Sequence, residues 1–315
     1  MNTTSEHVIR TILVGQSGGP TAAINASLAG AVRAAHAQGL RVLGMRNGIQ
    51  GFLEGGVVDL AEELELEVFN QNEVNPGEKN LQLLRKTPSS WLGSCRFKLP
   101  ELEPNPATCS SSESAAISPI YQQIDAQLKK YQVDAVLYIG GNDSMDTTDK
   151  LSRYFAQIES HVRVVGVPKT IDNDLEGTDH TPGFGSAARF VASVTAELTR
   201  DGGVYNSKNV TFIEAMGRDA GWLTAAGALA QDICGAAPDF VLLPEIPLDE
   251  HALLSAIEQR LREKNNVIVV VSEGVHHADG SFLFDAKSVA IDTFGHLAAQ
   301  SGTAQYLSQL VKDQL

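Results

Sequence analysis

The chain has 315 residues, 43% of them hydrophobic, which is enough for two domains of roughly 150 residues, each with its own core. Acidic residues outnumber basic ones by 38 to 24, and the formal net charge of −14 disfavours attraction to nucleic acid phosphates. No apolar run reaches the roughly 20 residues of a membrane-spanning helix. Composition therefore indicates a globular protein, and we expect neither nucleic acid nor a membrane among its partners.

The N-terminal residues and the cysteines give two further expectations. Residues 1–7 contain no basic stretch followed by an apolar core, so we expect no secretory signal and a cytoplasmic location. The three cysteines, Cys95, Cys109 and Cys234, are an odd number without Cys-x-x-Cys spacing, which argues against a disulfide framework and a zinc site. We interpret them as ordinary thiols.

Short β-rich runs, glycine turns and helical stretches follow one another along the chain. The first unit has a predicted strand at residues 11–14, a turn at 15–20 and an alanine-rich helix at 21–38 that Gly39 ends. Further strands are predicted at residues 41–45, 133–139, 162–167, 209–215, 240–243 and 267–271.

This alternation is typical of α/β proteins with mainly parallel sheets covered by helices on both faces. We expect two Rossmann-like lobes, residues 1–183 and 184–315, with a boundary near Gly183. Residues 62–80 are acidic and residues 100–114 are rich in Pro, Ser and Glu, so both are predicted to be surface insertions or loops.

Polar, glycine-containing turns follow several predicted strands, and ligands of open α/β sheets bind at the carboxyl ends of the strands. The first turn, residues 17–19, is Ser-Gly-Gly and opens a helix, so unpaired amides and the helix dipole would face an anion there. A tight strand-to-helix connection explains the same residues equally well.

The second turn, residues 140–144, is Gly-Gly-Asn-Asp-Ser and adds a carboxylate to that pattern. Asp143 would repel a phosphate unless a divalent cation lay between them, so it suggests a metal-phosphate site. The alternative is that Asp143 or Ser144 caps the following helix. The turn alone supports both interpretations equally.

The third turn concentrates charge, because Lys169, Asp172 and Asp174 follow a buried strand. Two carboxylates at i and i+2 of an extended segment point the same way and resist joint ionisation unless a metal or lysine compensates. One could hold Mg²⁺ while the other accepts the proton of an attacking hydroxyl, with Lys169 neutralising the transferring oxygens. The alternative is an Asx-turn beside a solvated lysine.

Three more segments carry polar groups suited to a phosphorylated ligand. Arg218, in Met216-Gly217-Arg218, could grip a phosphate at a strand end, and Glu273 could bind sugar hydroxyls. Arg96 and Lys98 are the cations near a Gly-Ser turn at residues 93–94. The Arg218 segment is unspecific on its own, and an unused surface glutamate explains Glu273 equally well. Solvated surface charge is the alternative for Arg96 and Lys98.

Taken together, seven segments resemble the phosphofructokinase family in sequence and order, over nearly the whole chain: residues 17–19, 92–94, 140–144, 168–174, 216–218, 244–245 and 272–274. The Thr-Ile-Asp-Asn-Asp and Met-Gly-Arg segments are highly specific. The resemblance implies a phosphofructokinase-like fold and Mg²⁺-dependent phosphorylation of fructose 6-phosphate at its 1-hydroxyl. It implies a phosphoryl-donor lobe at residues 1–183 and a sugar-phosphate lobe at 184–315.

The resemblance also implies roles for single residues. Asp172 matches the proton acceptor, and Asp174 and Asn142 match magnesium-associated positions. Gly18, Gly19 and Arg96 match the phosphoryl-donor site. The substrate-binding positions match Thr170, Ile171, Asp172, Met216, Gly217, Arg218 and Glu273, with Thr170 also among the catalytic residues.

Asp143 and Lys169 resemble the pyrophosphate-dependent branch of the family, where ATP-using members have glycine at both places. Asp143 would put a carboxylate where the α-phosphate of a nucleotide lies, and Lys169 could stabilise pyrophosphate during transfer. Both residues are therefore assigned to donor binding and to catalysis. Because the energy of the pyrophosphate bond resembles that of the product ester, the implied reaction should be readily reversible.

Three departures from the family pattern leave alternatives open. Asn142 replaces an aspartate that many members use as a metal ligand, although an amide oxygen can still bind Mg²⁺. The chain ends at Leu315, before a later basic motif that helps hold the 6-phosphate, and Asn209 stands where many ATP-dependent members have an arginine given to a neighbouring subunit. We expect a homo-oligomer, a dimer or a tetramer. An ATP-dependent 6-phosphofructokinase and a non-catalytic sugar-phosphate-binding regulatory subunit are the alternative functions.

Overall fold

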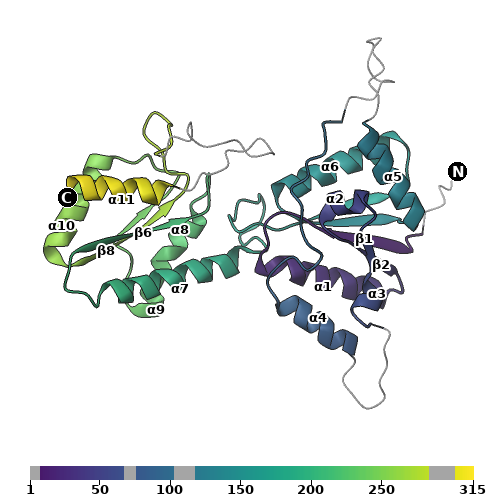
Figure 1. Cartoon of the computed structure of the whole chain (residues 1–315), viewed down its shortest axis with the longest axis horizontal. Coiled ribbons are helices and arrows are strands. Elements are labelled where there is room, and N and C mark those ends of the chain that lie inside the picture. Colours follow the sequence, from purple (N-terminus) through teal and green to yellow (C-terminus); the bar gives the residue numbers. More distant parts are fainter. Residues whose placement is uncertain (1–7, 67–75, 103–117, 284–301) are drawn as a thin grey trace, which may run out of the picture. The chain divides into compact units, whose positions relative to one another are not determined.

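The computed structural model describes residues 8–66, 76–102, 118–283 and 302–315. The chain forms two compact units, Met1–Lys169 (unit 1) and Thr170–Leu315 (unit 2), which are drawn in Figure 1. Each unit contains a mainly parallel sheet with helices, so the predicted α/β fold class is confirmed. The boundary between the two units lies between Lys169 and Thr170. It precedes the predicted boundary near Gly183 and falls within the charged third turn.

The sheet of unit 1 has the order β3-β2-β1-β4-β5, and all of its strand pairs are parallel except β2 with β3. The chain builds outwards from β1 to β2 and β3, and then returns to the other side of β1 with β4 and β5. Sheets with such a reversal bind ligands where the order reverses, outside the carboxyl ends of the strands. The strands are β1 (Thr11–Gln16), β2 (Arg41–Met45), β3 (Val57–Asp59), β4 (Ala135–Gly140) and β5 (Arg163–Pro168).

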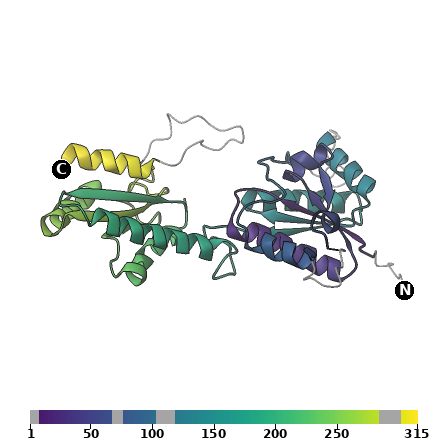
Figure 2. The ribbon, with the colours of Figure 1, turned by 60° about the horizontal axis from the view of Figure 1, so that its bottom comes forward.

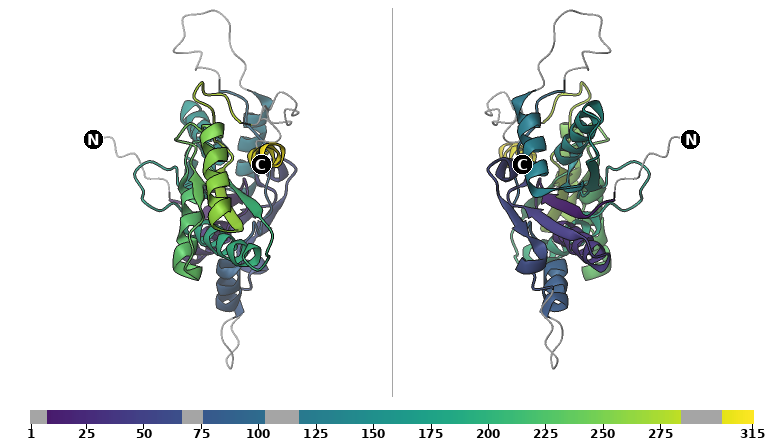
Figure 3. Two further views of the ribbon diagram at one scale, coloured as in Figure 1. Left: turned by 90° about the vertical axis from the view of Figure 1, so that its left-hand side faces the viewer. Right: turned by 90° about the vertical axis from the view of Figure 1, so that its right-hand side faces the viewer.

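Helices cover both faces of this sheet because successive strand residues point to opposite sides. Leu13 and Leu43 pack with α2, α5 and α6, whereas Val14 and Val42 pack with α1, α3 and α4. In the right-hand view of Figure 3, β1 and β2 lie side by side in purple and dark blue. The helices are α1 (Ala22–Ala37), α2 (Gly48–Leu53), α3 (Leu60–Glu63), α4 (Pro76–Lys86), α5 (Pro119–Tyr131) and α6 (Asn142–Gln157).

Unit 2 has a smaller parallel sheet of order β6-β8-β7. The central strand is a run of buried valine and isoleucine, residues 267–271, as expected for a strand covered on both faces. Helices α7 and α8 pack on one face, and α10 and α11 pack on the other; in Figure 2 the strands run between α7 and α11. The elements are α7 (Phe184–Gly202), β6 (Asn209–Ala215), α8 (Trp222–Ala226), α9 (Ala230–Cys234), β7 (Phe240–Leu242), α10 (Glu250–Glu263), β8 (Asn266–Ser272) and α11 (Thr303–Gln314).

The sequence predictions differ from the structure in a few places. The prediction that residues 62–80 form an insertion or loop is wrong at both ends, because α3 extends to Glu63 and α4 begins at Pro76. Leu81 and Leu84 of α4 are buried against α1. The antiparallel strand β3 was not predicted. The described residues do not include 67–75 of the first predicted loop, 103–114 of the other predicted loop, which contains Cys109, or 1–7. None of the helices in the described ranges has the length and apolar character that a membrane span needs.

Alanine at Gly15 and at Gly30 should change the stability of unit 1 in opposite directions. A Cβ at Gly15 would lie 2.7 Å from ring carbons of Tyr138 and 2.8 Å from Met45 Sδ, so Gly15→Ala should lower the free energy of unfolding by about 1–3 kcal/mol through overpacking. A Cβ at Gly30, on the exposed side of α1, meets no atom within 4 Å. Gly30→Ala should therefore raise the free energy of unfolding by about 0.5–1 kcal/mol.

Urea unfolding followed by tryptophan fluorescence measures both effects. The chain has two tryptophans, Trp91 in unit 1 and Trp222 in unit 2. In a Trp222→Phe background the fluorescence reports unit 1 alone. An unfolding free energy of Gly15→Ala equal to or above that of the background protein would contradict the packing argument.

Candidate functional site

Two polar turns of unit 1 and Lys169, at the start of the third turn, lie at the carboxyl ends of neighbouring strands. The turn after β1 is joined to β4 by a hydrogen bond from Ser17 N to Ile139 O of 2.9 Å, and Lys169 N, after β5, donates to Gly140 O over 2.9 Å. Gly18 has a φ of +79°, a conformation that L side chains rarely adopt. The structure thus brings together the first turn, the second turn and Lys169 of the third turn.

Lys169 lies among these turns. The residue is buried, with 7% of its surface exposed, and its Nζ donates a 2.8 Å hydrogen bond to Gly19 O. A Cβ placed at Gly18 or at Gly141 would lie 4.0 Å from Nζ, so both glycine backbones approach the ammonium closely. The alternative of a solvated lysine is therefore wrong, and the structure provides a buried positive charge in a cradle of glycine backbone.

Asn142 and Asp143 form the start of α6, next to this cradle. The residue at the N-cap is Gly141, which makes no side-chain capping bond, so the alternative that Asp143 or Ser144 caps the helix is wrong. The Asp143 side chain is 60% exposed, and Oδ1 lies 3.5 Å from Lys98 Nζ. A carboxylate in the first turn of a helix is favoured by the helix dipole.

A segment without regular structure, residues 92–101, runs past these turns, and we call it the strap. Ser94 Oγ donates to Gly18 O over 2.7 Å, and Ser17 Oγ donates to Cys95 O over 3.1 Å. These two bonds join the strap to the turn after β1. Arg96 comes directly after Cys95 and is exposed, which places this predicted donor-binding residue beside the turn.

The strap is also held by Gln16, which the sequence interpretation missed. Gln16 is fully buried. Its Oε1 accepts from Leu92 N over 2.9 Å and from Ser90 Oγ over 3.3 Å, while its Nε2 donates to Ile24 O over 3.1 Å and to Asn25 Oδ1 over 3.0 Å. Gln16 falls in the predicted turn at residues 15–20, whereas the structure extends β1 to Gln16, so no clear sequence signal indicates this role.

Tyr138 lies beneath the strap. Its ring is buried in the core, and its hydroxyl accepts from Ile49 N over 3.3 Å and lies 3.9 Å from Cys95 Sγ. Burial raises the pKa of Tyr138 above its ordinary value, so the hydroxyl stays neutral over the physiological range. It therefore serves as a structural support for the strap.

The predicted acceptor residues lie in unit 2. Thr170 N donates to Pro182 O over 3.1 Å, and Thr170 Oγ1 accepts from Asp172 N over 3.1 Å. Asn173 has a φ of +58°, so the prediction that Asp172 and Asp174 lie on one extended segment is wrong. The backbone bends there because the Asn173 side chain bonds Thr181 N and Asp179 O, which leaves Asp174 exposed and Asp172 half-buried.

Two strand ends of unit 2 bring the other predicted substrate-binding residues together. Gly217 N donates to Glu273 Oε1 over 3.2 Å, and Ser272 Oγ donates to Gly217 O over 2.7 Å. Met216 is 57% exposed, and Arg218 is exposed as well. Ile171 packs with the apolar cluster of α7 and α8, so its side chain has a packing role.

The proposed metal ligands fit a hard cation by their chemistry. Asn142 and Asp174 are exposed and offer amide and carboxylate oxygens, the ligand type that Mg²⁺ prefers. They belong to different units. Within the described parts of the chain, no group of three or more His, Cys, Asp and Glu side chains is placed to hold a metal ion.

Comparison with known proteins gives one consistent result. The family model described as phosphofructokinase matches residues 11–315. A pyrophosphate--fructose 6-phosphate 1-phosphotransferase of Xanthomonas campestris is 39% identical over 96% of this chain and 67% of the relative, and one of Halomonas elongata is 34% identical over 95% and 66%. The crystal structure of a pyrophosphate-dependent phosphofructokinase from Marinobacter aquaeolei matches with a TM-score of 0.73 and 31% identity, over 97% of this chain and 66% of that one. The chain spans about two thirds of the length of these proteins.

Replacing Gln16 should loosen the strap. Gln16→Leu removes the acceptor of Leu92 N, a buried group, and should lower the unfolding free energy of unit 1 by about 2–4 kcal/mol. Gln38→Leu, at an exposed amide after α1, is the matched control and should change it by less than about 0.5 kcal/mol. Urea unfolding measures both, and equal effects of the two substitutions would contradict the role given to Gln16.

Proposed function

The chain belongs to the phosphofructokinase family, and we propose that it transfers a phosphoryl group from pyrophosphate to the 1-hydroxyl of fructose 6-phosphate, giving fructose 1,6-bisphosphate. The reaction is Mg²⁺-dependent and readily reversible in this proposal. The proposal also includes a cytoplasmic location and a homo-oligomer, a dimer or a tetramer.

The buried ammonium of Lys169 carries this proposal. Lys169 Nζ lies at Gly19 O and close to Gly18 and Gly141, where glycine turns leave room for a phosphate against the backbone. A positive charge in such a water-poor position stabilises the charge that develops on transferring phosphoryl oxygens. This supports Lys169 as a catalytic residue that also binds the donor with Gly18 and Gly19.

Pyrophosphate suits this half of the site better than ATP does. Asp143 projects from the first turn of α6 as an exposed carboxylate, and it would repel the α-phosphate of a nucleotide, a group that pyrophosphate does not have. Arg96 and Lys98, on the strap, supply positive charge on the same side of unit 1. In the proposal Asp143 selects the donor and takes part in catalysis, and Arg96 binds the donor.

The acceptor half of the proposal rests on unit 2. Asp172 accepts the proton of the sugar hydroxyl as it attacks, and Thr170 orders the backbone of this segment through its bond to Asp172 N. Asp174 and Asn142 are the proposed magnesium ligands, and the bound cation would neutralise phosphate oxygens. The sugar phosphate is bound by Thr170, Ile171, Asp172, Met216, Gly217, Arg218 and Glu273.

A donor assay tests the proposed reaction. Purified protein with Mg²⁺ and fructose 6-phosphate should form fructose 1,6-bisphosphate when pyrophosphate is supplied and not when ATP is supplied. Turnover with ATP alone would overturn the donor assignment. If neither donor supports turnover while calorimetry shows tight fructose 6-phosphate binding, the chain is a sugar-phosphate-binding protein instead.

Replacing Asp172 should remove the general base. Asp172→Asn keeps the shape of the side chain, and it should lower kcat by about 10²–10⁴-fold with little change in fructose 6-phosphate binding. Asp179→Asn, at an exposed carboxylate of the same segment, is the matched control and should leave kcat unchanged. A near-normal kcat for Asp172→Asn in the forward reaction would contradict the assignment of Asp172 as the general base.

A further inference from the structure

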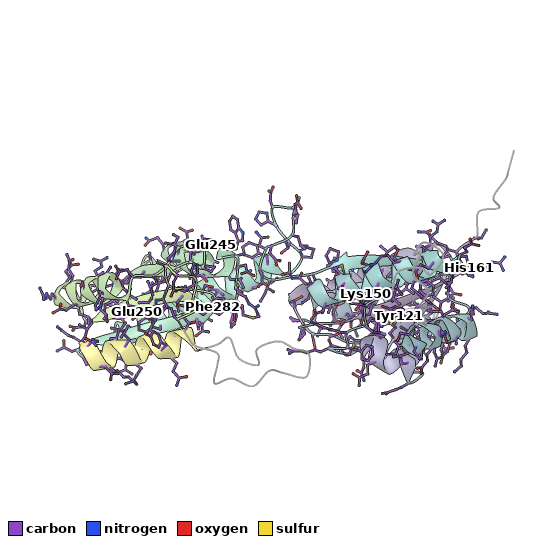
Figure 4. All side chains as sticks on the ribbon, turned by 90° about the horizontal axis from the view of Figure 1, so that it is seen from above. Tyr121, Lys150, His161, Glu245, Glu250 and Phe282 are labelled. Carbon is purple, nitrogen blue, oxygen red and sulfur yellow. The ribbon has the colours of Figure 1, made fainter. Side chains whose placement is uncertain are left out.

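Lys150, on α6, is a buried lysine that neither the sequence interpretation nor the proposed chemistry uses. Its side chain is 5% exposed. It lies on the stripe of α6 that also buries Thr147, Leu151 and Tyr154, a position where lysine is rare unless it is paired. Figure 4 labels Lys150 and the neighbouring Tyr121 of α5.

The ammonium of Lys150 has three oxygen partners. Nζ donates to the backbone oxygen of Leu99 over 3.2 Å, and it lies 2.8 Å from Glu101 Oε1 and 2.8 Å from Asp146 Oδ2. Burial lowers the pKa of Lys150, but the hydrogen bonds with Asp146 and Glu101 outweigh it and leave the pKa raised. Two of the three partners, Leu99 and Glu101, belong to the strap.

The strap is thus attached at both ends, and its two cations lie between the attachments. At one end, Ser17 Oγ bonds Cys95 O. At the other, Lys150 bonds Leu99 O, and Tyr121 Oη donates to Pro100 O over 2.7 Å. Residues 96–98 form no strand or helix, so their path depends on these attachments.

We propose that Lys150 is a positioning residue for the phosphoryl donor: by holding Leu99 and Glu101 it fixes the strap so that Arg96 and Lys98 stay beside the turns after β1 and β4. The proposal rests on the proposed function of the same site. Lys98, which lies 3.5 Å from Asp143, is thereby a second strap cation directed at pyrophosphate. Lys150 itself acts only through the strap.

The test compares Lys150→Met with a matched control. Lys150→Met keeps the length and apolar stem of the side chain and removes its ammonium. Arg153→Met removes a cation about one turn further along α6. Arg153 pairs with exposed Asp149, and none of the hydrogen bonds or ion pairs among the described residues joins it to the strap. Lys150→Arg, which keeps the charge and the donors, is the rescue variant.

Steady-state kinetics should separate positioning from general damage. In Lys150→Met the KM for pyrophosphate should rise by about tenfold or more, the loss expected for one charge-assisted contact, while the KM for fructose 6-phosphate stays within about twofold. Lys150→Arg should recover most of the pyrophosphate KM. If Lys150 only stabilised the fold, Lys150→Met would reduce the fraction of folded, active protein. Both KM values would then be unchanged. That result would overturn the proposal.

Limited trypsin digestion without substrate gives a second, independent measurement. Residues 99–128 contain no lysine or arginine, so cuts in the strap are confined to Arg96 and Lys98 and are identified by fragment mass. Cleavage there should be faster in Lys150→Met than in Arg153→Met, and equal rates would contradict the proposed hold on the strap. If Lys150→Met does not fold, Lys150→Gln carries the same tests.

The two proposals fail in different ways. Absence of turnover by the unsubstituted protein with pyrophosphate would overturn the proposed function. The digestion rates would still decide whether Lys150 holds the strap. Turnover with an unchanged pyrophosphate KM in Lys150→Met would overturn the positioning role alone.

Discussion

Four hydrogen bonds of the Gln16 side chain connect the end of β1, the start of α1 and the strap. Because Gln16 is fully buried, water cannot replace any of these hydrogen bonds. Losing one would leave a buried polar group without a partner and lower the free energy of unfolding. The four bonds fix the backbone directly before the turn at residues 17–19, where the strand order of the sheet reverses. Together with the bonds of Ser17 and Ser94, this side chain fixes the strap against the turn in the donor half of the candidate site.

Much of the fold could be predicted because it follows from local patterns. The buried run of β8 at residues 267–271 is apolar throughout, and β2 and β6 begin and end at the predicted residues. Strand β3 was not predicted because it is a short edge strand of three residues. The start of α4 was assigned to a loop because the acidic residues before it dominate the composition of the region. Neither feature carries a strong periodic signal of its own.

The site could be predicted only where the chemistry lies within one short segment. Lys169, Gly18 and Asp143 come from dense polar turns, and the parallel sheet brings those turns to one edge. The left-handed backbone of Asn173 depends on its contacts with Asp179 and Thr181, and Lys150 depends on a strap distant in sequence. Such contacts join positions that no local pattern relates, so sequence alone predicts an extended segment in the first case and an ordinary helix lysine in the second.

Lys169 is the last residue of unit 1, and Thr170 is the first residue of unit 2. Only Thr170 and Ile171 therefore stand between the proposed donor cation and the proposed base, Asp172. Ordering a residue's backbone costs roughly 1–2 kcal/mol of conformational entropy, and the bonds of Thr170 to Pro182 and Asp172 already restrict this connection in the free protein. The short segment between these two proposed residues is thus already restricted by its own hydrogen bonds before any ligand is present.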